Sequence, residues 1–284
     1  MNSTIEQVAA GISRLPAIPS VAGELLRLCR ENGDDENTLN MLIRSDPALL
    51  CYILKVSNAA YFGKPAAIFT LTEAIEQLGI RKIRDIAKGH ACFSLAKLAD
   101  YPPQAERCWQ HILLRTIAAE CVAEQYSPSE SEYFMTLTAL SHIGELAKIN
   151  QNAVESLNGN TSDEKKLFLN FDQHEFGAII LKKWNLPEQI PIIIRSLNNP
   201  DAISEMPMLY RHVRFVLLAR ELADYLRHGN HSATDNRRLW DAVNSGLCAS
   251  TDAFITLAGS IRQRVQNYIR AILALGIRVG DTGL

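Results

Sequence analysis

Apolar residues recur at helical spacing along this chain, and signals that start or stop helices separate the segments that carry them. Leu49, Leu50, Ile53 and Leu54, for example, fall on one face of a helix. No comparable series of alternating apolar and polar residues predicts strands. We therefore expect an all-α protein, folded as a bundle of several helices.

The expected helix starts carry capping residues. Asp46 followed by Pro47 is an N-cap with proline at the first helical position. Thr70 with Glu73 forms a capping box, and Gly79 can end the helix that it opens. Further start signals of this type are Ser129 with Glu132, Thr161 with Glu164 and Asp172 with Glu175.

Two proline-containing breaks interrupt the series of helices. The first is Tyr-Pro-Pro at 101–103, and the second runs over 198–207. We expect two helical lobes, which occupy residues 14–100 and 104–200. The remaining helices, over 207–278, are expected to pack on the second lobe.

The composition indicates a soluble globular protein. The chain has 284 residues, is 47% hydrophobic and carries a formal net charge of -2, which gives no reason to expect nucleic acid or an acidic membrane as partner. No apolar run reaches the roughly 18 residues that a membrane span needs. The 6 cysteines include no Cys-x-x-Cys pair, which favours buried thiols in a reducing compartment. The expected location is the cytoplasm.

An ordered series of short motifs resembles a known family. The first motifs are Leu-Pro-Ala-Ile-Pro at 15–19, Ile-Arg-Ser-Asp-Pro-Ala-Leu at 43–49 and Ser-Asn-Ala-Ala-Tyr-Phe-Gly at 57–63. The later ones are Cys-Trp-Gln-His at 108–111, Leu-Ser-His-Ile-Gly at 140–144, Phe-Asp-Gln-His-Glu-Phe-Gly at 171–177 and Trp-Asn-Leu-Pro-Glu at 184–188. In this order they resemble the HDOD family, the HD-related output domains of bacterial signalling proteins, over about residues 14–200.

The resemblance implies a helical bundle related to HD-type metal phosphohydrolases, in most members without their activity. Such domains are similar to interaction or output modules that are often joined to cyclic-dinucleotide enzymes or receiver domains. The fold implied is therefore HD-domain-like, and the function implied is signal transduction rather than catalysis.

The motif at 140–144 is similar to the Leu-His-Asp-Ile-Gly stretch of HD phosphohydrolases with its metal-binding pair replaced. Ser141 stands in the histidine position and His142 in the aspartate position. A dinuclear site needs a carboxylate to bridge its cations, which neither serine nor neutral imidazole provides. We expect no catalytic residue, and a vestigial pocket formed by His111, Ser141, His142, Asp172 and His174.

A residual metal site is the alternative to an empty pocket. His142 and Glu145 are three residues apart and would face the same side of a helix. Imidazoles with one carboxylate can hold a single zinc ion, so His111, His142 and His174 are candidate ligands of one divalent metal. Where relatives often have histidines, this chain has Asn198 and Asn199, so we favour no cofactor.

Two segments are candidates for an interaction surface. Arg81 and Arg84 share a helix face, for which a solvated surface is the default. The alternative is an anion contact, either to the phosphate of a nucleotide messenger or to nucleic acid. Asn58, Tyr61 and Phe62 belong to the third motif, where the two aromatic residues are expected to pack unless the surface beside Asn58 binds a partner.

The sequence as a whole favours a non-catalytic, cytoplasmic signalling module of bacteria whose partners are other signalling proteins. A metal-dependent phosphohydrolase with unusual ligands is one alternative. A sensor that binds a cyclic dinucleotide or another nucleotide without hydrolysing it is the other. Membrane and nucleic-acid partners are not expected.

Overall fold

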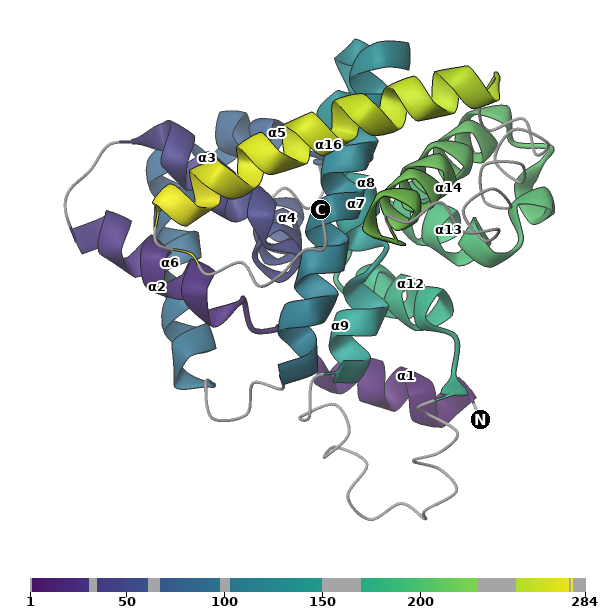
Figure 1. Ribbon diagram of the computed structural model, residues 1–284. Coiled ribbons are helices and arrows are strands. Elements are labelled where there is room, and N and C mark those ends of the chain that lie inside the picture. Colours follow the sequence, from purple (N-terminus) through teal and green to yellow (C-terminus); the bar gives the residue numbers. More distant parts are fainter. Residues whose placement is uncertain are drawn as a thin grey trace. The chain divides into compact units, whose positions relative to one another are not determined.

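The computed structural model describes residues 2–30, 35–60, 67–97, 103–149, 170–228, 249–275 and 277, and the regular structure in these ranges is helical (Figure 1). The predicted all-α fold is confirmed. The helix start at Thr161, the aromatic pair Tyr61 and Phe62 and the break at 101–102 lie outside the described residues. None of the described helices combines the length and hydropathy that a membrane crossing requires.

The chain forms two compact units, and each is discontinuous in sequence. Unit 1 comprises Met1–Trp109 and Leu140–Asn198, and unit 2 comprises Gln110–Ala139 and Asn199–Leu284. The lobe expected over 104–200 is therefore divided between both units. Prolines mark where a helix begins but not which core it packs into, and helix α7, Pro103–Tyr126, contributes residues to each unit.

Unit 1 contains most of the helices. They are α1 (Asn2–Gly11), α2 (Pro19–Arg30), α3 (Glu36–Ser45), α4 (Pro47–Ala60), α5 (Leu71–Leu78), α6 (Ile80–Ala96), α9 (Ile143–Ile149), α12 (Gln173–Lys183) and α13 (Gln189–Arg195), with the 3-10 helix η3 (Ser196–Asn198). Helix α2 packs along α6, and α12 packs against α9, α13 and α1. Because α12 has these three neighbours, most of its side chains are buried.

Unit 2 contains the rest of α7, η2 (Pro128–Glu130), α8 (Ser131–Leu140), η4 (Pro200–Ile203), α14 (Pro207–His228) and α16 (Thr251–Ala274). Helix α14 packs against η4 and α16. Ion pairs join α7 to both long helices: Arg115 to Asp224 at 3.0 Å, and Arg264 to Glu124.

Local capping signals explain where several helices begin. The Thr70 hydroxyl accepts the Glu73 N–H at 3.2 Å and the Glu73 carboxylate accepts the Thr70 N–H at 3.0 Å, so the predicted capping box is confirmed. Gly79, with φ 80°, ends α5 and precedes α6, which needs the left-handed region that glycine adopts readily.

The start predicted at Ser129 was wrong. Helix α8 begins at Ser131, after the 3-10 turn Pro128–Glu130. Proline at the start of this turn sets a tighter first turn, and the Glu130 carboxylate accepts a hydrogen bond from the Ser127 hydroxyl. Ser129 therefore lies inside this 3-10 turn, and Glu132 lies in the first turn of α8.

Candidate functional site

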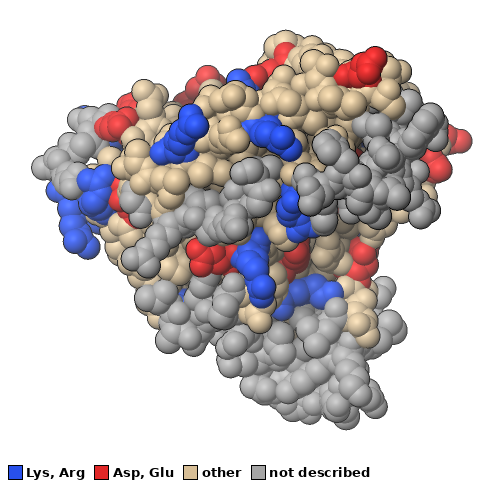
Figure 2. Space-filling view, in the orientation of Figure 1, with Lys and Arg blue, Asp and Glu red and all other residues tan. Residues whose placement is uncertain are grey.

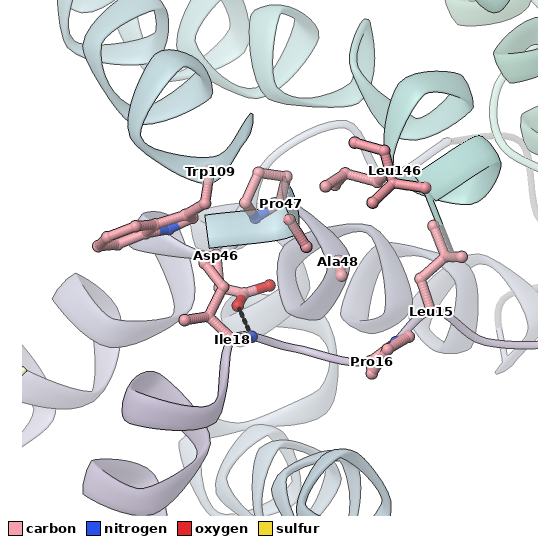
Figure 3. Close-up of a pocket in the computed structure, with 10 residues that line it drawn as sticks. Leu15, Pro16, Ile18, Asp46, Pro47, Ala48, Trp109 and Leu146 are labelled. Carbon is pink, nitrogen blue, oxygen red and sulfur yellow. Dashed lines mark hydrogen bonds between the residues drawn. The ribbon is translucent and has the colours of Figure 1, made fainter. Parts of the chain in front are cut away.

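The N-terminal motifs meet at the carboxylate of Asp46 (Figure 3). Its Oδ1 accepts the Leu49 N–H at 2.9 Å, which caps α4 as predicted. Its Oδ2 accepts the Ile18 N–H at 2.7 Å, the bond drawn in Figure 3. One side chain thereby fixes the start of α4 and the Leu-Pro-Ala-Ile-Pro segment that enters α2.

Asp46 is buried, and none of the described residues places a cation beside its carboxylate. Only 1% of the residue is exposed, and this burial raises the pKa of its carboxyl group to about 6, although the backbone N–H groups of Ile18 and Leu49 oppose the rise. The carbonyl oxygen of the preceding residue, Ser45, accepts a hydrogen bond from the indole N–H of Trp109 at 2.6 Å. These motif residues therefore determine how the helices of unit 1 join.

A small cavity lies beside this junction. Its volume is about 30 Å³, and residues from three of the motifs line it. Among the lining residues shown in Figure 3 are Leu15, Pro16, Pro47, Trp109 and Leu146. Space of this size suits about one water molecule and is far below the volume of a nucleotide site.

The replaced metal doublet lies at the turn between α8 and α9. Ser141 and His142 are buried, with 2% and 3% of each residue exposed. The His142 Nδ1 lies 3.0 Å from Glu145 Oε2, so the two side chains face each other, as their spacing predicts. The carboxylate thereby acts as a hydrogen-bond partner of this imidazole.

Asp172, a predicted pocket residue, already accepts two N–H donors. Its Oδ1 accepts the Glu175 N–H at 2.8 Å, because Asp172 is the N-cap of α12. Its Oδ2 accepts the side-chain amide of Asn198 at 2.5 Å. Asn198 thus supplies a neutral donor to the carboxylate, while His174, in the first turn of α12, is buried in unit 1.

His111 belongs to unit 2, whereas the other predicted pocket residues belong to unit 1. The guanidinium Nη1 of Arg227 lies 2.5 Å from its Nε2 and 3.2 Å from its Nδ1. An imidazole nitrogen that accepts from a guanidinium has its lone pair engaged, and the positive charge of Arg227 opposes a second cation there.

These residues do not fit the dinuclear metal centre that the HD relationship implies. A hydroxyl and an imidazole stand where histidine and the bridging carboxylate would be needed. Asp172 and His111 both have protein donors at hydrogen-bond distance. Within the described ranges, no group of three or more His, Cys, Asp and Glu side chains is arranged to hold a metal ion.

Asn58, predicted as part of an interaction surface, has a structural role. Its side chain accepts the Ile68 N–H at 3.1 Å and donates to the Ile68 carbonyl at 2.9 Å, and it also donates to the Leu54 carbonyl. This pair of bonds holds the chain that enters α5 against α4. Tyr61 and Phe62, in the same motif, lie outside the described residues.

Asn58→Ala is expected to lower the free energy of unfolding by about 1–3 kcal/mol, because it leaves the Ile68 N–H and carbonyl without their partner. Urea denaturation measures this difference. Asn37→Ala, at an exposed position of α3, is the matched control and should change stability by less than about 0.5 kcal/mol. Equal effects of the two substitutions would contradict the role of Asn58.

The basic residues of α6 behave as a mixed surface. Arg81 and Lys88 are exposed and Arg84 is half-buried, while Ile83 and Ala87 lie in the core. On the face that Figure 2 shows, basic side chains are interspersed with acidic and uncharged ones. Interspersed charge of this kind is typical of a solvated surface.

Sequence reasoning missed a second cluster, around Arg14. The Arg14 side chain donates to the Tyr52 hydroxyl, and its guanidinium carbon lies 3.9 Å from the centre of the Tyr52 ring and 4.9 Å from that of Phe93. The ring of His90 lies 4.9 Å from that of Tyr52 and is fully buried. The one signal in the sequence was an arginine directly before the Leu-Pro motif, with no acidic residue beside it in the sequence.

The fold and the altered doublet define an HD-related helical domain in which His111, His142 and Asp172 contact protein side chains. The sequence profile of the HDOD domain family matches residues 15–200, and the chain belongs to this family. The resemblance found in the motifs is confirmed.

Relatives of known sequence or structure are distant. An uncharacterized protein from Treponema pallidum (strain Nichols) is 24% identical over 235 residues, which are 77% of this chain and 45% of that protein, so the chain spans less than half the length of this relative. The MmoQ response regulator from Methylococcus capsulatus has a TM-score of 0.63 at 22% identity, over 80% of this chain and 94% of that one. A virulence factor from Campylobacter jejuni has a TM-score of 0.63 at 17% identity, over 93% and 99%. At such identities the likeness concerns the fold.

Proposed function

We propose that this chain is a non-catalytic signal-transduction module that works in the bacterial cytoplasm by binding other signalling proteins. The observation that supports it is the state of the HD-like positions. Ser141 and His142 replace the metal doublet, and Asp172 accepts a hydrogen bond from the side-chain amide of Asn198. That a response regulator shares the fold is in keeping with this proposal.

The chemistry of the donors favours binding over hydrolysis. Metal-assisted phosphoester hydrolysis needs an activated water held between cations that a carboxylate bridges. The carboxylate nearest the doublet, Glu145, hydrogen-bonds to His142, and Asp172 is the N-cap of α12. Both carboxylates therefore have structural roles. We infer that the chain acts through its folded surface rather than through a hydrolytic site.

Two measurements on tag-free protein test the proposal. We expect metal analysis to find far less than one Mn²⁺, Fe²⁺ or Zn²⁺ per chain, and nucleotide and cyclic-dinucleotide substrates with added Mn²⁺ to show the same turnover as buffer. The matched variant is His142→Ala, which should change neither result. Stoichiometric metal with turnover, both lost in His142→Ala, would reject the proposal in favour of a phosphohydrolase.

A melting experiment separates the remaining alternative, a nucleotide sensor. A ligand that binds the folded state raises the melting temperature in proportion to the logarithm of its concentration. We expect no shift with nucleotides or cyclic dinucleotides at millimolar concentration. A saturable rise with one nucleotide would replace protein binding by nucleotide sensing as the function.

A further inference from the structure

Helix α1 lies outside the segment that the family profile matches, 15–200, yet it is packed on the matched domain. Its buried side chains follow one helical stripe: Ile5, Val8, Ala9 and, just beyond its end, Ile12. The residues between them, Glu6 and Gln7 among others, are exposed. This pattern is that of a short amphipathic helix docked by one face, and its contact in unit 1 is α12 (Figure 1).

Residues 12–19, which we call the strap, connect α1 to α2 and are tied to the domain by side chains rather than by helix packing. Four of these ties hold the backbone of the strap. They are Trp184 Nε1 to the Ile12 carbonyl at 2.8 Å, Lys55 Nζ to the Ser13 carbonyl, the Ala17 N–H to Ser94 Oγ at 2.8 Å and the Ile18 N–H to Asp46 Oδ2 at 2.7 Å.

The charged side chain of the strap is Arg14, which is half-buried. Its guanidinium lies over the faces of Tyr52 and Phe93, an arrangement in which the ring quadrupoles attract the cation. His90 lies beside both rings and is fully buried, and neither of its ring nitrogens has a hydrogen-bond partner in the part of the chain that the structure describes. Burial and the charge of Arg14 lower the pKa of His90 to about 3, so the imidazole is neutral and does not repel the guanidinium.

A ten-residue helix is not stable on its own in water, so α1 remains helical only while it is docked. A helix that packs by one face against a neighbouring helix, as α1 does on α12, can open locally at lower free energy than the core. The hydrogen bonds of the strap and the contacts of Arg14 with Tyr52 and Phe93 therefore determine how often α1 dissociates from α12.

We propose that the face of α12 under α1 is a docking surface for an amphipathic helix. In this structure α1 occupies that face and competes with a partner helix for it, and the contacts of Arg14 hold α1 in place. The partner is a protein segment with aliphatic residues at the spacing of Ile5, Val8, Ala9 and Ile12. This inference deepens the proposed function, because it assigns the surface through which a binding module would act.

Hydrogen exchange of the full chain, read by mass spectrometry, tests whether Arg14 holds α1 in place. In Arg14→Ala, amides of residues 5–19 are expected to exchange roughly 3- to 30-fold faster, the factor that a lost cation–π contact corresponds to, while α4 and α6 keep their rates. Lys55→Met, which removes a different tie, should act on the same amides. Arg30→Ala, an exposed arginine at the end of α2, is the matched control and should change none of them. Exchange of α1 only together with the core would overturn the proposal.

A labelled peptide of residues 2–19 tests the docking surface. It is expected to bind full-length Arg14→Ala more tightly than the wild-type chain, by about the same factor as the exchange, because the face is vacant for a larger fraction of time. No binding to either chain, with faster exchange in Arg14→Ala, would show opening without a docking surface and would reject the proposal. Phosphohydrolase turnover is measured separately, so a failure of the proposed function is distinguishable from a failure here.

Discussion

Gly144→Ala is expected to lower the free energy of unfolding by about 3 kcal/mol or more. A Cβ at this position would lie 1.9 Å from the Gln173 carbonyl oxygen and 2.6 Å from the Gly177 nitrogen. Both are backbone atoms at the start of α12, so no side chain can rotate away to make room. Helices α9 and α12 would have to separate, which would uncover the residues between them.

Denaturation with urea measures this loss. Gly89→Ala is the matched control, because Gly89 lies on the exposed side of α6, where an added methyl group would meet no other atom within 4 Å. That substitution should raise stability by about 0.5–1 kcal/mol, since alanine restricts the unfolded chain and favours a helix. A stability of Gly144→Ala within about 0.5 kcal/mol of the wild type would show that α9 and α12 approach less closely than described.

The second large effect is a pH dependence that comes from Asp46. Its pKa is raised from 3.8 to about 6 in the folded chain, so the folded state binds the proton more tightly than the unfolded state does. Stability contributed by this group is therefore absent near pH 7.5 and grows as the pH falls through 6. From linkage we expect about 1.4 kcal/mol gained between about pH 7.5 and about pH 5, and about 3 kcal/mol at the acidic limit.

The measurement is the unfolding free energy of wild type and Asp46→Asn at both pH values. An asparagine oxygen can still accept from the Leu49 N–H, and it does not titrate. His90 and His212, whose pKa values are lowered by burial, make the folded state less stable as the pH falls and so work in the opposite direction. Because both histidines are present in both proteins, the comparison cancels their contributions. An identical pH dependence of the two proteins would contradict a raised pKa at Asp46.

The sequence predicted what depends on neighbouring residues. The capping interactions of Asp46, Thr70 and Asp172 were predicted correctly, because each joins residues three apart along the chain. The family and the all-α class followed from motif order and periodicity. Not predictable was the division into discontinuous units, since proline and glycine signals report where a helix starts or stops and carry no information on packing partners.

The candidate site shows the same limit. The exchange of the doublet for Ser141 and His142 is visible in the sequence, and so is the spacing of His142 and Glu145. The partners of Asp172 and His111 are not, because Asn198 and Arg227 lie 26 and 116 residues away from them. Such pairs arise only when the helices pack.

The close approach of Gly144 and Gly177 uses main-chain atoms. Helix α9 and helix α12 are therefore held in register by a close backbone contact, and this contact does not involve the side chains of the two residues that precede the Ile-Gly pair. The fold and the hydrolytic chemistry therefore depend on different residues of this domain. A hydrolase of the same fold would lose its activity when two side chains are changed, whereas one methyl group added at Gly144 would destabilise the fold.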